Sequence, residues 1–243
     1  AFSELDRKFI TAFERYLKEA CGLARNTAAK YLECFRKVLK VAQQKGWMEH
    51  GKFLEELGQL CVKEETYPSF LDWDELRTVM ETDMPAGRLE RVKDVFVFCA
   101  FTGLSYQGIS TLCPSHLFRD DEGTLWICRT RAEGAKVGDS CTSSVPLLKP
   151  AMVLLEKYKG WNPMNPEGPC FPVPSVQKMN EYLKEVAVRC RISKCLTTQM
   201  ARNTFAATVT LANRIPKEHV REMLGYSSDY MLRHYMQAQE RNS

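Results

Sequence analysis

The chain has 243 residues, which is enough for one large domain or two small ones with a buried core. Its composition, 44% hydrophobic and 26% charged, is ordinary for a soluble globular protein. It has neither a signal peptide nor an apolar run near the roughly 18–20 residues of a membrane span, so we expect a cytoplasmic protein. The net charge of +4 is compatible with nucleic-acid binding but does not require it.

The ten cysteines do not form a disulfide or zinc pattern. They are scattered singly, often between apolar residues as in Phe98-Cys99-Ala100, and the sequence contains no C-x-x-C pair. Only four histidines accompany them. We therefore interpret them as reduced, buried thiols, and expect neither a metal site nor a cofactor.

Three helices are predicted in residues 1–62, because apolar residues recur there at helical spacing. They are expected to run from Ser3, with Asp6 as capping partner, to Gly22; from a cap at Asn26 or Thr27 to Gly46-Trp47; and from about Gly51 to Cys61.

The second of these helices carries a basic face opposed only by Glu33. Its members are Arg25, Lys30, Arg36, Lys37, Lys40 and Lys45. Such a face is either a solvated helix surface or a surface that follows the phosphates of a nucleic acid. Both interpretations stay open on the charge pattern alone.

A linker is predicted at residues 63–68, where the sequence is charged, lacks apolar periodicity and ends in Pro68. We expect a helical domain at 1–62 and a second domain at 69–243. A flexible joint between them would let two domains close around duplex DNA.

The second domain is predicted to be mainly α-helical with one small three-stranded antiparallel sheet. Ser69 and Asp72 are candidate caps of its first helix, and a helix around 92–101 is apolar nearly all round, as in a core helix. Strands are expected at 116–119, 124–131 and 141–147, with a turn at 120–123. Helices follow at 150–158 and 175–190, separated by a loop at 160–174.

The last helices contain the candidate catalytic residues. Thr197 or Thr198, Pro216, and Ser227 or Ser228 are expected to start them. Arg202 offers a planar fork of donors that suits a phosphate, and Tyr235 offers a phenol that can attack phosphorus. Because no nucleotide-binding motif accompanies them, the phosphate is expected to belong to a polymer.

Three ordered segments resemble the motifs of the tyrosine recombinase (phage integrase) family. They are F-T-G-L-S-Y at 101–106, Q-M-A-R-N-T-F-A at 199–206, and Leu224-Gly225-Tyr226 followed at the family's spacing by Tyr235. The variant motifs look most like those of Bacteroides-type mobile elements. The first domain likewise resembles the family's small helical (SAM-like) core-binding domain.

The resemblance implies a site-specific recombinase that cleaves and rejoins duplex DNA through a 3′-phosphotyrosyl link. It implies Tyr235 as nucleophile and Arg202 as the second catalytic arginine. Lys136 is the candidate general acid if the hairpin carries an insertion; a solvated loop lysine is the alternative. Candidate DNA contacts are Arg25, Lys30, Arg36, Lys37, Lys40 and Arg233. The expected partner is double-stranded DNA, bound by a tetramer that is monomeric when free, with no membrane association.

The chain departs from the family pattern at several positions. Ser105 stands where the family has its first arginine, and Gly108 replaces the acid that usually follows. Gln199 and Tyr226 occupy the two positions usually held by histidine. Asn203 replaces the histidine after the second arginine. The upstream cations Arg88, Arg91 and Lys93 are candidates to supply the missing charge.

Two other functions compete with the recombinase hypothesis. A catalytically weakened relative would bind DNA as an architectural or regulatory protein. An unrelated helical interaction protein would require the ordered motifs to be coincidental. The first alternative predicts DNA binding without covalent attachment, and the second predicts no salt-dependent DNA affinity at all.

Overall fold

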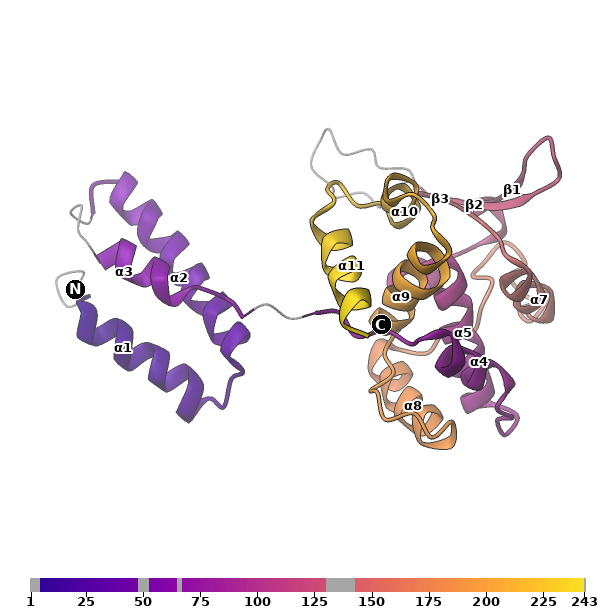
Figure 1. The fold of residues 1–243 in the computed structure, drawn as a ribbon, viewed down its shortest axis with the longest axis horizontal. Helices are drawn as coiled ribbons and strands as arrows, with labels where there is room; N and C mark the ends of the chain where they lie inside the picture. Colours follow the sequence, from indigo (N-terminus) through magenta and orange to yellow (C-terminus); the bar gives the residue numbers. More distant parts are fainter. Residues whose placement is uncertain (1–4, 48–52, 65–66, 130–142, 243) are drawn as a thin grey trace. The chain divides into compact units, whose positions relative to one another are not determined.

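The computed structural model describes residues 5–47, 53–64, 67–129 and 143–242, and divides into two units at residues 1–66 and 67–243 (Figure 1). The first unit contains three helices. They are α1 (Arg7–Arg15), which continues as the π-helical turn η2 (Tyr16–Ala20), α2 (Arg25–Gln44) and α3 (Phe53–Leu60). One apolar core, including Ile10, Leu32 and Leu57, holds them together.

The helix starts of this unit differ from the predicted ones. Asp6 is the N-cap of α1 and accepts a 2.7 Å hydrogen bond from the amide of Phe9, whereas Ser3 lies outside the described residues. Helix α2 begins after Ala24, not at an Asn26 or Thr27 cap. The Asn26 side chain instead exchanges two hydrogen bonds with the backbone of Glu64, at 2.8 and 3.0 Å. That pairing ties the end of the unit to α2, which local helix signals do not reveal.

The second unit is mainly helical with one three-stranded antiparallel sheet, as predicted. Its elements are α4 (Trp73–Glu81), α5 (Arg88–Thr102), α6 (Tyr106–Ser110), η3 (Pro114–His116), β1 (Leu117–Arg119), β2 (Leu125–Arg129), β3 (Ser143–Pro146), α7 (Lys149–Lys157), α8 (Val176–Arg189), α9 (Thr198–Thr204), η4 (Phe205–Thr210), η5 (Leu211–Asn213), α10 (Lys217–Leu224) and α11 (Tyr230–Asn242).

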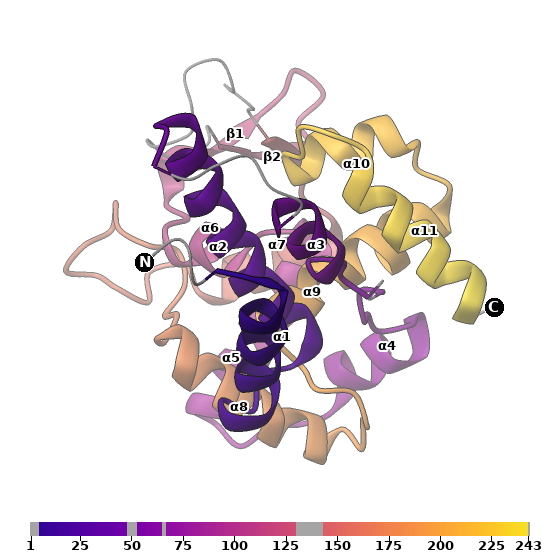
Figure 2. The same cartoon turned by 90° about the vertical axis from the view of Figure 1, so that its left-hand side faces the viewer.

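Helix α5 is the centre of this unit, as its all-round apolar sequence predicts. It packs against α4, α7, α8 and α9, and every residue from Asp94 to Thr102 is buried (Figures 1 and 2). The buried Asp94 carboxylate pairs with Lys157, which reaches it from the surface at 2.6 Å, and accepts from the hydroxyl of Tyr158 at 2.9 Å. The pairing removes the cost of leaving a buried carboxylate alone.

The sheet has the strand order β1-β2-β3 and links the hairpin to α10. Its register pairs Ile127 with Leu117 on one side and with Val145 on the other. Ile127 and Val145 are buried, so this face of the sheet covers the core. At the far end of β2, Arg129 is paired with Ser143 of β3.

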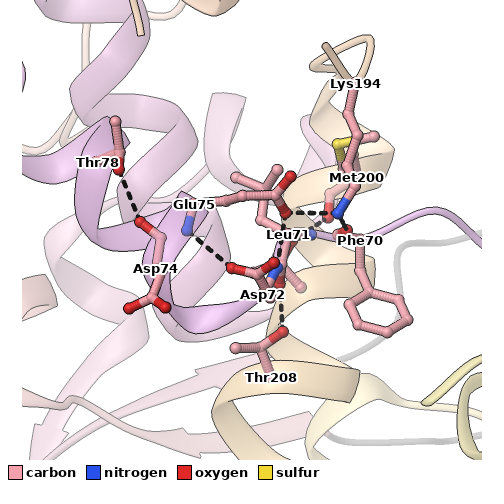
Figure 3. A network of polar contacts seen from close by, with 10 residues as sticks. Phe70, Leu71, Asp72, Asp74, Glu75, Thr78, Lys194, Met200 and Thr208 are labelled. Carbon is pink, nitrogen blue, oxygen red and sulfur yellow. Dashed lines mark hydrogen bonds and ion pairs between the residues drawn. The ribbon is translucent and has the colours of Figure 1, made fainter. Parts of the chain in front are cut away.

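A polar network fixes the segment that leads into α4 (Figure 3). Asp72 caps α4 by accepting from the amide of Glu75, and the Glu75 carboxylate accepts from the amide of Asp72 in return. Lys194 binds Glu75 and donates to the carbonyl of Phe70 at 3.0 Å. The hydroxyl of Thr208 donates to the carbonyl of Leu71, so this segment is held against η4.

The described cysteines are all free thiols, and their burial varies. Cys99 and Cys190 are buried as expected, whereas Cys21, Cys34 and Cys195 are exposed. Within the described ranges no group of His, Cys, Asp or Glu side chains is arranged to hold a metal ion. No helix in those ranges is long and apolar enough to cross a membrane.

Candidate active site

Arg202 joins three elements at one point. It lies on α9, which starts at the N-cap Thr197, one of the two predicted caps. One terminal nitrogen donates to the carbonyl of Gly103 after α5, and the other to the carbonyl of Leu224 at the end of α10, both at 2.5 Å. Carbonyls at helix C-termini have no partner in their own helix and carry partial negative charge. The guanidinium therefore locks the ends of two helices together.

The positive charge of Arg202 forms no ion pair with any carboxylate that the structure describes. Its Nε lies 3.4 Å from the hydroxyl of Tyr226, and Cζ lies 4.9 Å from the centre of the Tyr226 ring. Contacts with described residues thus use three of the five N–H groups of this guanidinium, and two remain. A partly buried guanidinium without a carboxylate suits the binding of an external anion.

Gly103 permits this close packing. Its φ is +68°, in the left-handed region that ends helices and favours glycine. A Cβ at this position would lie 2.5 Å from the Phe205 ring and 2.9 Å from Leu224. Any other residue would therefore move the carbonyl that Arg202 binds.

Tyr235 is fully buried on α11, which packs against η4. Its hydroxyl donates to the side-chain carbonyl of Asn203 at 3.0 Å and lies 3.3 Å from the hydroxyl of Tyr226. Burial, followed by the neighbouring Tyr226, raises the pKa of Tyr235 far above its ordinary value, although Arg202 opposes the shift. The phenol is therefore neutral and held in place.

Asn203, which the sequence showed only as a departure from the family pattern, connects several residues of the site. Its carbonyl also accepts from the amide of Gln199 at 3.0 Å, and its own amide donates to the carbonyl of Ser69 at 2.9 Å. Asn203 thus joins Gln199 to Tyr235, and the hydroxyl of Tyr226 joins Tyr235 to Arg202, so four predicted site residues form one network. A polar residue within a buried helical stretch was the available signal.

Ser105 has a local structural role. It is exposed at the N-cap of α6, where its hydroxyl accepts from the amide of Gly108 at 3.1 Å. Such a cap satisfies one of the free amides in the first turn of a helix. The residue at the first-arginine position thus builds α6 and brings no charge.

The upstream cations do not supply the missing charge, which corrects that expectation. Arg88 pairs with Glu185 at 3.3 Å, and Lys93 donates to the carbonyls of Met80 and Thr82 at 3.3 and 2.9 Å. Arg91 donates to the carbonyl of Gly87 at 3.1 Å. All three lie in the first half of α5, roughly 13–21 Å along the axis from its C-terminal end at a rise of about 1.5 Å per residue. They are held too far from Gly103 to join Arg202.

A different guanidinium lies beside α6. Nη1 of Arg129 would be 2.8 Å from a Cβ at Gly108, and Nη2 donates to the hydroxyl of Thr111 at 2.8 Å. Arg129 is only partly exposed, and burial lowers its pKa. The sequence signal was Gly108 itself, a small residue where the family has an acid.

Comparisons with known proteins agree with this architecture. Residues 1–57 match the family model of the phage integrase SAM-like domain. The Tn1549 transposon integrase in complex with transposon right end DNA superposes with a TM-score of 0.72 and 14% identity, covering 96% of this chain and 84% of that one. The XerH site-specific recombinase bound to its difH substrate superposes with a TM-score of 0.68 and 16% identity, covering 98% of this chain and 69% of XerH. A lambda integrase dimer bound to a core site superposes with a TM-score of 0.66 and 15% identity, covering 94% of this chain and 78% of that one.

The chain has the tyrosine recombinase fold. This confirms the fold inferred from the ordered motifs. A search of curated protein sequences gives no significant match. At 14–16% identity the structural likeness establishes the fold, so the roles of individual residues are argued from the geometry of the site.

The candidate general acid falls outside this geometry. Lys136 lies in residues 130–142, outside the described part of the chain. The described residues on either side are Arg129 and Ser143. A Cβ at Gly225, next to Tyr226, would lie 3.6 Å from Cβ of Ser143. The role of Lys136 stays a prediction from the resemblance.

The predicted DNA contacts differ in how they are held. Arg25 pairs with Glu64 at 2.5 Å and Lys37 with Glu33 at 3.5 Å. Arg36 is partly buried and donates to the carbonyl of Leu54 on α3 at 3.2 Å, so it links two helices of its own unit. The remaining three candidates are exposed and form no ion pair within the described residues: Lys30 and Lys40 on α2, and Arg233 on α11.

Proposed function

We propose that this protein is a site-specific DNA recombinase that cleaves and rejoins duplex DNA through a 3′-phosphotyrosyl intermediate. The observation that carries the proposal is the pairing of Arg202, without a carboxylate partner among the described residues, with Tyr235 through the hydroxyl of Tyr226. An anion-binding group and a phenol thus share one site. DNA as the partner is supported by XerH and the Tn1549 integrase, whose structures contain DNA.

The proposed reaction is a balanced phosphoryl transfer. The Oη of Tyr235 forms a bond to the scissile phosphorus while the bond to the 5′-oxygen breaks, and the phenol loses a proton as the leaving oxygen gains one. The two free N–H groups of Arg202 bind the non-bridging oxygens, where charge accumulates in the transition state. Gln199 and Tyr226 can donate further hydrogen bonds to them. Lys136 is proposed to protonate the leaving oxygen.

We infer that the proposed nucleophile, Tyr235, is held at rest by its hydrogen bond to Asn203. Attack requires the Tyr235 hydroxyl to exchange Asn203 for the phosphate, and therefore a displacement of α11 relative to η4. The exchange replaces one hydrogen bond by another, so its cost lies mainly in moving the buried ring. We infer that DNA binding shifts α11 into the attacking position.

We propose that exposed cations of both units bind the phosphates of the duplex. Lys30 and Lys40 lie on the basic face of α2, and Arg233 lies two residues from the nucleophile. We propose that the 1–62 and 69–243 domains bind the duplex through these faces, and that the protein acts as a transient tetramer on DNA. Phosphate contacts of this kind position the protein without reading its sequence.

The test is covalent trapping on a suicide DNA substrate, in which the cleaved fragment carrying the 5′-hydroxyl diffuses away. We expect a protein–DNA adduct on a denaturing gel that disappears in Tyr235→Phe while duplex binding persists. Tyr230→Phe is the matched control, because Tyr230 lies on the same helix but is 59% exposed. It should form the adduct normally.

The same experiment decides the competing function. Duplex binding without any adduct would identify a weakened relative that serves as an architectural or regulatory protein. The replacement of charged family residues by Ser105, Gln199 and Asn203 is the observation behind that alternative. An architectural or regulatory protein would have no evident use for a tyrosine held beside an anion-binding arginine.

A further inference from the structure

One guanidinium is missing from the site if the family pattern alone is followed. Ser105 caps α6, and Arg88, Arg91 and Lys93 are engaged along the first half of α5. We propose that Arg129, from strand β2, is a further catalytic residue that binds the scissile phosphate in place of an arginine at position 105. This inference rests on the proposed recombinase function.

The first observation is the space above α6. Gly108 lies one helical turn after Ser105, on the same side of the helix. Arg129 fills the volume that a side chain at 108 would occupy, because its Nη1 lies 2.8 Å from the position of that Cβ. The absence of a side chain at 108 therefore admits a guanidinium from the sheet beside the first-arginine position.

The second observation is the strand register, which is independent of α6. Arg129 pairs with Ser143, and a Cβ at Gly225 would lie 3.6 Å from that of Ser143. Gly225 precedes Tyr226, whose hydroxyl touches both Arg202 and Tyr235. Arg129 thus reaches the site from the sheet, on the same face of β2 as the buried Ile127.

The third observation is the unbalanced charge. In the described part of the chain Arg129 makes one hydrogen bond, to the hydroxyl of Thr111, and no ion pair. With respect to the described residues, four of its five N–H groups are available. A partly buried guanidinium whose charge is not balanced by a carboxylate is suited to binding an external anion. Arg119, at the hairpin end of the sheet, is by contrast exposed and bonds the local turn at the carbonyl of Gly123.

The chemistry assigned to Arg129 is charge stabilisation. During attack the bond from Tyr235 to phosphorus forms and the bond to the 5′-oxygen breaks, while Arg129 remains a cation and transfers no proton. It binds a non-bridging oxygen together with Arg202, so two guanidinium groups share the charge of the transition state.

The test compares two suicide substrates, one with an ordinary scissile phosphate and one with a methylphosphonate there. The methyl group replaces a charged non-bridging oxygen, so the transition state carries one negative charge fewer and a single guanidinium, that of Arg202, can balance it. We expect Arg129→Ala to lower the rate of adduct formation about 100- to 1,000-fold on the phosphate, and by less than about threefold on the methylphosphonate. Arg119→Ala, the matched control, should cleave both substrates as the unaltered protein does.

The contrary results are distinct. Arg129 is structural if Arg129→Ala forms the adduct on the phosphate substrate within about threefold of the normal rate, or if its rate falls equally on both substrates. In that case this inference fails while the proposed function stands. If the unaltered protein forms no adduct on either substrate, the proposed function fails and the inference fails with it. Should Arg129→Ala not fold, as judged by its melting temperature, Arg129→Gln keeps a hydrogen bond to Thr111 and is judged by the same criteria.

Discussion

The hydroxyl of Tyr235 donates a 3.0 Å hydrogen bond to the side-chain carbonyl of Asn203, so an amide holds the proposed nucleophile at rest. Because Tyr235 is fully buried, this bond also satisfies a polar group that has lost its water. The same contact therefore stabilises the fold and keeps the phenol from the phosphate. We propose that DNA binding releases the tyrosine.

Asn203→Ala should destabilise the protein and loosen Tyr235. Removing the amide leaves the buried hydroxyl of Tyr235 with only the longer contact to Tyr226, and leaves the carbonyl of Ser69 without the Asn203 amide, at a cost of about 1–3 kcal/mol. Urea unfolding measures the loss, and nitration by tetranitromethane followed by mass spectrometry measures access to Tyr235.

Asn213→Ala is the control for that variant. Asn213 donates to the carbonyls of Thr208 and Val209 and forms no hydrogen bond to Tyr235. It should lower stability without increasing nitration of Tyr235. Equal nitration of Tyr235 in both variants would show that general loosening, not loss of the Asn203 contact, exposes the ring.

Stability should fall in alkaline solution because of Tyr235. Burial raises the pKa of Tyr235 above its ordinary value of 10.0, so the folded phenol keeps its proton when the unfolded one loses it. The contribution is complete below pH 10 and declines as pH rises towards the folded pKa. Tyr235→Phe should therefore reduce the slope of unfolding free energy against pH above 10 by about 1.4 kcal/mol per unit. Identical slopes in urea titrations would contradict the assignment.

Cys99 should contribute in the same direction at a lower pH. Burial raises the pKa of Cys99 from 9.0 to about 12, with a small opposing effect of Arg202. Stability from this thiol is complete below pH 9 and is lost between pH 9 and about 12. Cys99→Ala should flatten the slope between pH 9 and 10, where the tyrosine of the unfolded chain is still mostly protonated. A slope that does not change would show that Cys99 is not the group responsible.

Gly108→Ala should impair catalysis more than folding. The added methyl would lie 2.8 Å from Nη1 of Arg129 and must displace that flexible side chain. We expect unfolding free energy to change by less than about 1 kcal/mol, since alanine favours helices, while cleavage of the phosphate substrate falls.

A double-mutant cycle isolates the cause of that fall. If Gly108→Ala acts by moving Arg129, it should add nothing to Arg129→Ala. Additive losses of cleavage rate would show that position 108 acts on the site by another route.

The exposed lysines of α2 should set the salt dependence of duplex binding. Lys30→Ala and Lys40→Ala should each reduce the slope of log affinity against log salt by about 0.9, which is the value for one phosphate contact. Lys18→Ala is the comparison, because Lys18 pairs with Glu14 at 2.6 Å outside α2. An unchanged slope in both α2 variants would identify the basic face as a solvated helix surface.

Much of the fold could be predicted from local patterns. The buried helix α5 follows from apolar residues on all sides, and the sheet follows from short strand segments around the turn at 120–123. The pairing of Arg202 with Tyr235 followed from the spacing of family motifs. Each of these signals is contained within a short stretch of sequence or a fixed spacing.

The rest depended on tertiary contacts. Asn26 bonds Glu64 instead of capping α2, because a partner 38 positions away competes with the local amides. Arg129 reaches α6 only through the strand register and the space left by Gly108. The burial of Tyr235 depends on how α11 packs against η4, which the polar sequence around it does not indicate.

The central claim is tested most directly by locating the covalent bond. The trapped protein–DNA adduct is digested with nuclease and protease and analysed by tandem mass spectrometry. We predict one modified peptide, with a 3′-linked nucleotide phosphate on the hydroxyl of Tyr235. A nucleotide on any other residue, or none in protein that binds the duplex tightly, would contradict the account.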